Sequence, residues 1–453
     1  MGLLSSPVGL VLPALILGAT TAMAVSQPTA EDDELRTRVE AVLKNTPLID
    51  GHNDIPWAYR SRVKNHLAEM DFASDLSAGP RPTHTDLPRM KKGMIGGQFW
   101  SVFTPVSTAG DGAARFVFEQ IDLVHRLVEA YPDHLEIAYG PADIRRAHAA
   151  GRIASLMGME GGHCIENSLG VLRGLYRAGA RYMTLAHSKN NDWVDSCTDE
   201  PRADGLTKFG VEVVREMNRM GMLVDLSHVS PAAMHDALDV AAAPVIFSHS
   251  SARALCDHPR NVPDDVLARI KDHLGGGVVM VTWVPSFVSE DCRTWPDRLK
   301  EAEKEIKKAH PGDVETIASK TNEWKSAHPK PKATLAIVAD HIEHVRKVAG
   351  VNCVGIGGDL DGVGSLPVGL EDCTTYPDLL IELARRGWSD EDLGKLAGGN
   401  LLRVFEVSEK IAARLQKERP ASDVLISELD EPIASEDEDE GGGARPPRRD
   451  RSR

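Results

Sequence analysis

The sequence predicts a (β/α)₈ barrel of the TIM type, and three observations lead to this fold class. Between residues 47 and 417, eight short apolar segments are separated by longer stretches, many of them amphipathic. The apolar segments do not alternate with polar residues, which is typical of parallel strands covered on both faces. Several of them end in His, Asp or Glu, and barrel active sites form at the carboxyl ends of the strands. An open doubly wound sheet is the alternative architecture.

The order of the elements follows from the hydrophobic pattern. The expected strands are Pro47–Asp50, Gly97–Phe103, Ala154–Met159, Tyr182–Ala186, Leu223–Leu226, Val245–Ser248, Gly277–Thr282 and Cys353–Gly357. Amphipathic stretches predict helices at Ser168–Ala178, Phe209–Met220, Pro231–Val240, Pro263–His273 and Ala333–Val348. The pair Ser230-Pro231 supports one of these starts, because serine caps a helix and proline suits its first turn. Residues 298–332 are rich in Lys, Glu and Pro and predict an insertion after the seventh strand.

Segments outside residues 47–417 have a different character. Residues 1–24 are predicted to be a signal peptide, because an apolar run from Val8 to Ala22 leads into the small-x-small site Ala22-Met23-Ala24. Cleavage after Ala24 would export the protein to the periplasm, the cell envelope or the exterior; an uncleaved N-terminal anchor is the alternative. Residues 25–46 form a lead-in. Residues 418–453, acidic and then basic, are expected to be a disordered tail, and a solvated tail without a function is its simplest interpretation.

Composition excludes several classes of partner and site. The chain is 42% hydrophobic and 26% charged, as soluble globular proteins are. Its formal charge of −15 argues against nucleic acid or anionic lipid as the main partner. The six cysteines are scattered and contain no C-x-x-C pair, so a zinc ribbon or a thioredoxin-like site is not supported. In an exported protein one or two disulfides are compatible with these cysteines, but their spacing does not pair them.

The first candidate metal ligands are His52 and Asp54, an H-x-D pair at the end of the first expected strand. Side chains on a strand repeat every two residues, so both point to the same side. Imidazole and carboxylate together suit Zn²⁺ or a similar divalent ion. An H-x-D pair alone is a weak signal, because it occurs by chance in many proteins.

Polar residues end the later strands as well. These residues are Glu160, His187, His228, His249 and Asp359. A single histidine at a strand end is more often structural than a ligand. Six successive strand ends of this kind favour one shared site, because the carboxyl ends of barrel strands lie together. The sequence therefore predicts a metal site at the mouth of the barrel.

Six ordered motifs resemble those of the membrane (renal) dipeptidases, peptidase family M19 of the amidohydrolase superfamily. They are Glu160–His163 (EGGH), Arg181–Ser188 (RYMTLAHS), Asp225–Ser230 (DLSHVS), Ser248–Ser251 (SHSS), Arg260–Asp265 (RNVPDD) and Gly357–Gly362 (GGDLDG). The likeness extends from about Leu48 to Glu409, which is most of the expected folded chain. It implies a (β/α)₈ barrel with two zinc ions and a dipeptidase activity.

The resemblance also implies how the metals are held. His52 and Asp54 would hold one zinc ion, and His228 and His249 would hold the other. Glu160 would bridge the two ions. A hydroxide that bridges the metals would then attack the peptide carbonyl.

Three further residues would act on the substrate according to the same resemblance. His187 would contact the substrate and stabilise the oxyanion, and Asp359 would transfer protons. Arg260 would bind the C-terminal carboxylate, so the expected partners are small dipeptides with a free carboxylate. A D-residue on the C-terminal side and a homodimer are also plausible for the family.

This sequence departs from the animal enzymes at three points. Phe287 falls where those enzymes have a tyrosine near the substrate carboxylate. Of the animal disulfides, the resemblance leaves only an equivalent between Cys256 and Cys292 possible here. The sequence has no hydrophobic C-terminal tail for a lipid anchor. Two other functions keep the barrel: a two-metal amidohydrolase for a lactone, cyclic amide or N-acyl amino acid, and a binding protein with structural zinc.

Overall fold

The computed structural model describes residues 30–79 and 82–431. The predicted signal peptide and the end of the predicted tail lie outside these residues, so export stays a prediction. The strands in the described part are β1 (Leu48–Asn53), β2 (Ile95–Phe103), β3 (Leu135–Ile137), β4 (Ile153–Glu160), β5 (Ala180–Thr184), β6 (Leu223–Asp225), β7 (Ile246–Phe247), β8 (Val278–Val281) and β9 (Val354–Ile356).

Eight of these strands form a closed parallel barrel. Each strand from β4 to β9 pairs with the next, β9 pairs with β1, and β1 pairs with β2. The pairing of β2 with β4, from Gly97–Ala154 to Phe103–Glu160, closes the ring. All eight predicted strands are present, so the (β/α)₈ prediction is confirmed and the open sheet is excluded.

Strand β3 is the one element of the sheet that the sequence did not predict. It has three residues and pairs in parallel with Ile153–Ser155 at the start of β4. Strand β5 joins the same edge of β4 only from Met157 onward, so β3 occupies the edge that β5 leaves open. A three-residue segment with one charged residue has no periodicity by which a pattern search could find it.

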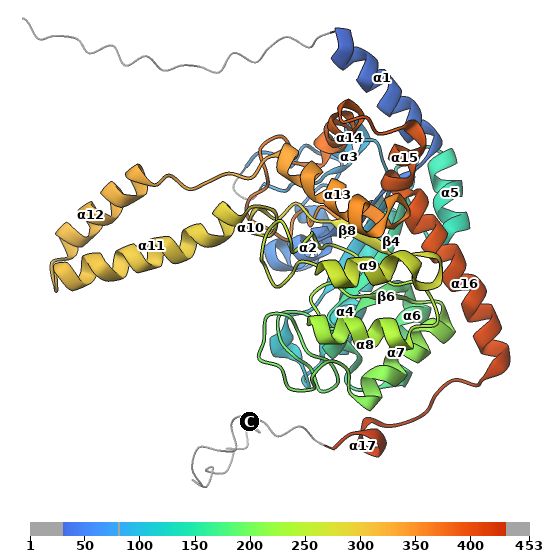
Figure 1. Ribbon diagram of the computed structural model, residues 1–453. Helices are drawn as coiled ribbons and strands as arrows, with labels where there is room; N and C mark the ends of the chain where they lie inside the picture. The colour runs from blue at the N-terminus through green and yellow to red at the C-terminus, as the bar shows by residue number, and fades with distance from the viewer. Residues whose placement is uncertain (1–29, 80–81, 432–453) are drawn as a thin grey trace, which may run out of the picture.

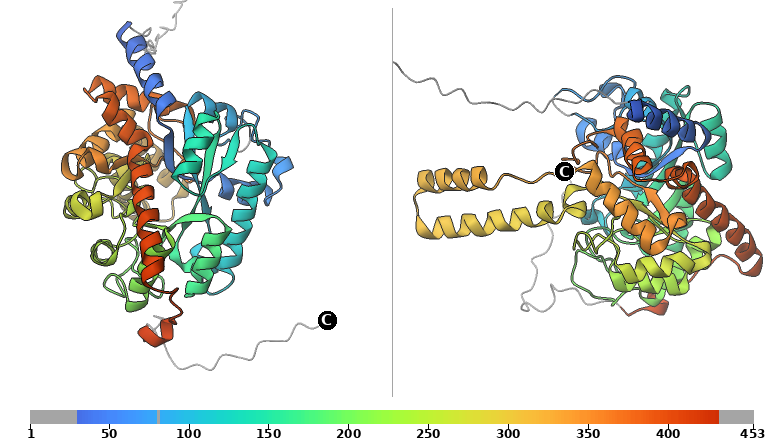
Figure 2. Two further views of the ribbon diagram at one scale, coloured as in Figure 1. Left: turned by 90° about the vertical axis from the view of Figure 1, so that its right-hand side faces the viewer. Right: turned by 45° about the horizontal axis from the view of Figure 1, so that its top comes forward.

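The helices surround the barrel (Figure 1; Figure 2). They are α1 (Ala30–Asn45), α2 (Ile55–Val63), α3 (Leu87–Lys92), α4 (Ala113–Ala130), α5 (Pro141–Ala149), α6 (Leu169–Ala178), α7 (Lys208–Met220), α8 (Pro231–Val240), α9 (Asp264–Asp272), α10 (Pro285–Val288), α11 (Glu290–Ala309), α12 (Val314–Ala327), α13 (Leu335–Ala349), α14 (Tyr376–Arg385), α15 (Asp390–Gly394), α16 (Asn400–Glu418) and α17 (Ile426–Leu429). All five predicted helices are present. In the described residues, no helix is both long and apolar enough to cross a membrane.

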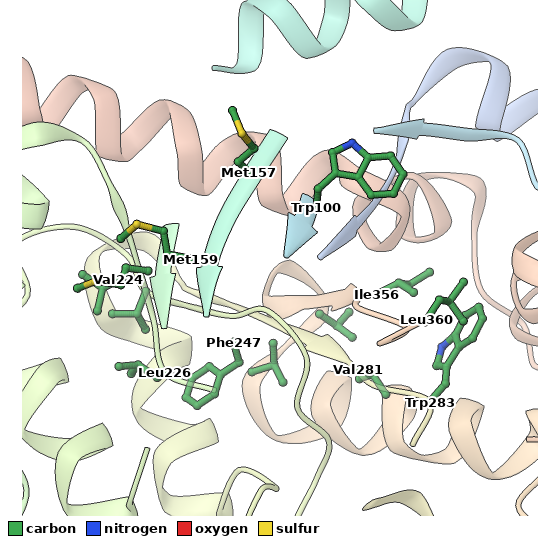
Figure 3. Close-up of a cluster of buried hydrophobic side chains, with 14 of the residues drawn as sticks. Trp100, Met157, Met159, Val224, Leu226, Phe247, Val281, Trp283, Ile356 and Leu360 are labelled. Carbon is green, nitrogen blue, oxygen red and sulfur yellow. The ribbon is translucent and has the colours of Figure 1, made fainter. Parts of the chain in front are cut away.

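The side chains of the strands separate into two apolar layers. Phe99, Leu156, Tyr182, Ile246 and Met280 belong to one buried cluster inside the barrel. The intervening residues belong to a second cluster between the strands and the helices, part of which is drawn in Figure 3. This alternation fills the barrel interior and leaves only the carboxyl ends of the strands open for a site.

The predicted insertion is a helical hairpin that projects from the barrel (Figure 1; Figure 2). It consists of α11 and α12 and begins at Glu290, eight residues before the predicted boundary. Trp295 and Trp324 face each other across it, with ring centroids 6.2 Å apart. The sequence predicts a later start for the insertion, because Cys292 and Trp295 give the first turns of α11 an apolar character like that of the barrel helices.

The first part of the predicted tail differs from expectation. Arg173 donates to the carbonyl of Ser422 at 2.7 Å. The carboxylate of Asp430 accepts from the backbone N–H groups of Lys208 and Phe209 at the start of α7, at 3.1 and 3.0 Å. Residues 419–431 are therefore attached to the barrel, because they supply partners that α7 would otherwise lack.

Candidate metal centre

The predicted ligands meet at the carboxyl ends of four strands. His52 lies in β1 with Asp54 just after it, and Glu160 is the last residue of β4. His228 and His249 follow β6 and β7 by three and two residues. All five are buried. Their convergence follows from barrel closure, which places the ends of parallel strands around one opening.

Glu160 lies at the centre of this arrangement. Its Oε1 atom is 3.0 Å from Nε2 of His228, 3.5 Å from Nε2 of His249 and 3.6 Å from Nε2 of His187. Its Oε2 atom is 3.5 Å from Nε2 of His52. Burial alone would raise the pKa of this carboxyl, but the surrounding imidazoles lower it well below its usual value. Glu160 is therefore an ionised carboxylate among four imidazoles.

The other carboxylates lie on the His52 side. Asp54 Oδ2 is 3.3 Å from Nε2 of His52. Asp359, after β9, can offer an oxygen within 4.8 Å of donor atoms of His52 and Asp54. Burial, together with the charges of Asp54 and Glu160, raises the pKa of Asp359 to about 8. The backbone of Asp359 has a φ of 59°, a left-handed conformation that is uncommon outside glycine and is often found at functional sites.

The donor set fits divalent metal ions. Nε2 of His228 and Nε2 of His249 are 3.0 Å apart. Burial lowers the pKa of both rings well below the usual value, so both are neutral. Two imidazole nitrogens that bind one tetrahedral zinc ion at about 2.0 Å lie roughly 3.3 Å apart, so little movement is needed. Three overlapping groups of candidate ligands occur here: His52/Glu160/His249, Glu160/His187/His228 and His52/Asp54/Asp359.

Arg260 borders the same pocket. Its guanidinium donates to the carbonyl of His249 at 3.1 Å and to Oγ of Ser250 at 3.3 Å. It also lies 5.4 Å from the centre of the Phe287 ring. Among the described residues its buried Nε has no hydrogen-bond partner, which leaves a donor for a ligand. Phe287 itself lines the pocket but offers no hydroxyl to that ligand.

The pocket has a volume of about 290 Å³. Two aromatic residues that line it, Trp57 and Phe103, are not predicted from the sequence. Trp57 and Phe103 form an edge-to-face pair with centroids 5.0 Å apart, and Phe103 also lies 5.0 Å from the His187 ring. Phe103 is the last residue of β2, so its place at a strand end could have identified it. Trp57 lies in α2, and no local signal marks it.

Asp50 links two parts of the chain that carry site residues. It accepts hydrogen bonds from the backbone N–H of His52 at 2.9 Å, from that of Gly358 at 2.6 Å and from the hydroxyl of Tyr376 at 2.7 Å. It thereby connects β1 to the loop that bears Asp359. Burial raises the pKa of Asp50 against the opposing effect of these donors. From the sequence, Asp50 is expected only as a strand residue, with no function assigned to it.

The disulfide that the resemblance left open is absent from the structure. Cys256 and Cys292 are both free thiols. Sγ of Cys256 contacts the carbonyl of Ser286 at 3.4 Å, and Sγ of Cys292 contacts that of Pro331 at 3.5 Å. The two sulfur atoms are directed at different carbonyls, so the pairing expectation is wrong for this structure.

Comparison with solved structures finds proteins of the same fold. Solved structures with the same fold include the probable dipeptidase PvdM from Pseudomonas aeruginosa, with 26% identity over 84% of this chain and 100% of that one and a TM-score of 0.70. A metallopeptidase from Rhodobacter sphaeroides has 22% identity over 80% and 99% of the two chains and a TM-score of 0.64. The dipeptidase AC has 24% identity over 80% and 98% and a TM-score of 0.64.

The profile of the family described as membrane dipeptidase (peptidase family M19) matches residues 36–419. That match covers the barrel from α1 to the end of α16, with every candidate ligand inside it. The predicted resemblance is confirmed, and with it a metal-dependent peptidase that acts on small peptides. The chain belongs to the membrane dipeptidase family, peptidase family M19.

Proposed function

We propose that the protein is a two-zinc dipeptidase that hydrolyses dipeptides with a free C-terminal carboxylate. The observation that supports this most is the position of Glu160 between two sets of ligands, with Arg260 in the same pocket. His52 and Asp54 would hold one zinc ion, and His228 and His249 would hold the other. Zinc at these positions would act as a Lewis acid on the peptide carbonyl and lower the pKa of water at the site.

The residues of the chain supply the remaining chemistry. Asp359 lines the pocket on the side of Asp54, where a carboxylate can take a proton from the attacking water and return it to the leaving amine. His187 lies across the pocket with Nδ1 unpartnered among the described residues, and its ring can donate to the oxyanion. Trp57 and Phe103 line the same pocket and would shield the reacting bond from water.

Removal of the metals tests the proposed cofactor. We expect prolonged dialysis against a chelator to abolish dipeptide hydrolysis, because without metal ions the site has no Lewis acid to activate water. Two equivalents of Zn²⁺ per chain should restore the activity, with metal content measured by elemental analysis of the same sample. Full activity in protein shown to be free of metal would refute the zinc mechanism.

The Arg260→Ala variant tests the substrate class. We expect kcat/KM for dipeptides to fall about 10- to 100-fold, mainly through KM, because a charged hydrogen bond contributes roughly 1.5–3 kcal/mol. A C-terminally amidated dipeptide is the matched control, since it lacks the carboxylate and should lose little on the same substitution. An equal loss for both substrates would reject Arg260 as the carboxylate anchor.

The dipeptide panel should contain both stereoisomers at the C-terminal position. The Rhodobacter sphaeroides metallopeptidase was solved with a phosphinate mimic of the dipeptide L-Ala-D-Ala. N-acyl amino acids, lactones and cyclic amides belong in the same panel, because they distinguish a dipeptidase from other amidohydrolases. Preference for one of these compounds over every dipeptide would replace the proposed substrate.

A further inference from the structure

Two of the four histidines around Glu160 have their outer nitrogen atoms held by hydroxyl groups. Nδ1 of His52 lies 2.9 Å from the hydroxyl of Tyr182. Nδ1 of His249 lies 2.8 Å from Oγ of Ser248. Among the described residues, Nδ1 of His228 and Nδ1 of His187 are buried without a partner. The four imidazoles are therefore not held equivalently.

The direction of each hydrogen bond follows from the second hydrogen bond that the same hydroxyl makes. A hydroxyl has one proton, so one that donates elsewhere must accept from the histidine. Tyr182 donates to the carbonyl of Gly51 at 3.1 Å, so His52 is the donor at Nδ1. Its Nε2 then presents a lone pair to the site, as metal binding requires.

The chain of bonds behind His249 ends on a carboxylate. Oγ of Ser248 donates to Oδ2 of Asp225 at 2.6 Å, while its other acceptor, Oγ of Ser227, is 3.5 Å away. The short bond to the carboxylate determines the direction, because a charged acceptor binds more strongly. Ser248 therefore accepts a hydrogen bond from Nδ1–H of His249, and Nε2 of His249 carries no proton.

Asp225 is held so that its oxygens can only accept. Oδ1 accepts from the backbone N–H groups of Ser227 at 3.1 Å and Ser248 at 2.8 Å. Oδ2 accepts from Oγ1 of Thr184 at 2.5 Å in addition to Ser248. Asp225 is completely buried at the end of β6, beneath the ligands and without direct contact to the pocket.

We propose that Asp225 is a positioning residue that acts through Ser248 to hold His249 as the Nδ1–H tautomer. Asp225 accepts the hydrogen bond of Ser248, and Ser248 in turn accepts from Nδ1–H of His249. This relay raises the basicity of Nε2 of His249, and so strengthens the proposed metal position formed by His228 and His249. The inference rests on the proposed function, in that the site holds metal. The matching bond behind His52 ends on a neutral carbonyl, so of these two imidazoles only His249 is supported by a carboxylate.

The Asp225→Asn variant reverses this chain of bonds with almost no change in volume. The amide oxygen can keep both backbone N–H groups, which turns its NH₂ group toward Ser248 and Thr184. Ser248 must then accept from the amide and donate to His249 Nδ1. The proton of His249 moves to Nε2, where it opposes metal binding.

The experiment is a zinc titration of the enzyme against a competing chelator. We expect one of the two zinc equivalents to bind roughly 10- to 100-fold more weakly in Asp225→Asn than in the parent, with the other unchanged. Ser248→Ala should show a similar loss. In the double variant the two losses should not add, because both remove the same chain of bonds. Ser248→Ala also provides the test if Asp225→Asn does not fold.

Thr184→Val is the matched control, because it removes one donor to Asp225 and leaves the bond between Ser248 and His249 in place. Its zinc affinities should stay close to those of the parent. Parent-like affinities in Asp225→Asn, additive losses in the double variant, or an equal loss in Thr184→Val would each overturn the inference. A parent enzyme that binds no zinc would instead overturn the proposed function, so the two failures are distinguishable.

Discussion

Replacement of Asp359 by Asn is expected to lower kcat for dipeptides about 10²- to 10⁴-fold, the usual contribution of a positioned general acid or base. Asp359 lines the pocket beside Asp54, and an amide of the same shape cannot exchange a proton with water or with the leaving amine. Because Asp359 is not among the five proposed ligands, the variant should still bind two zinc ions. Steady-state kinetics and metal analysis of one preparation measure both properties.

Asp361→Asn is the control for this prediction. Asp361 lies two residues further along the same loop, is half-buried, and also has a positive φ, 66°. Its carboxylate accepts from the backbone N–H of His84 at 2.8 Å and does not line the pocket. Turnover by Asp361→Asn should therefore stay near the parent value. If Asp359→Asn turned over dipeptides as fast as Asp361→Asn, Asp359 would have no role in proton transfer.

Replacement of Glu160 by Gln should have the largest effect on metal content. Among the described residues, Glu160 is the one carboxylate in contact with all four imidazoles, so its charge would serve both proposed metal positions. We expect fewer than two zinc ions per chain and a fall in kcat/KM of at least about 10³-fold, which corresponds to roughly 4 kcal/mol of lost transition-state stabilisation. Elemental analysis and kinetics on the same sample test this expectation.

The Ser101→Ala variant is the control for Glu160→Gln, because it tests a hydrogen bond to Glu160 apart from the charge of Glu160. The hydroxyl of Ser101 donates to Oε2 of Glu160 at 3.3 Å, so this variant removes a hydrogen bond and keeps the carboxylate. It should retain two zinc ions and most of the activity. Two tightly bound zinc ions in Glu160→Gln would show that the bridge is not Glu160.

The candidate ligands could be proposed from the sequence because the pattern that marks them is local. His52, Glu160, His228 and His249 each lie at or just after an apolar strand, and that pattern is visible in a dozen residues. The carboxyl ends of parallel strands meet wherever the barrel closes, so strand order alone brings these residues together. The strand-end pattern also marks His187 and Asp359 but does not separate their roles from those of the ligands, and it does not mark Arg260. The roles of these three residues therefore came from the resemblance.

The residues that support the ligands could not be predicted in this way. Tyr182 occupies an apolar strand and has the pattern of a core residue, yet its hydroxyl meets His52, 130 positions earlier in the chain. Asp50 reaches Gly358 and Tyr376 across separations of 308 and 326 residues. Such contacts depend on which side chains point into the barrel and how far they extend, and periodicity says nothing about either.

The sequence by itself determined the barrel, the order of its strands, the position of the insertion and the five residues proposed to hold the metals. The barrel, its strand order and the insertion follow from hydrophobic pattern, and the metal site follows from polar residues at strand ends, which are local properties of the chain. The choice of five ligands among those polar residues came from the family resemblance of the sequence. Only the tertiary structure decided that Cys256 and Cys292 are free, that residues 419–431 attach to α7, and that Asp225 stands behind His249. The physical reason is that hydrogen-bond direction and side-chain distance are set by packing between strands, which exists only once the barrel has closed.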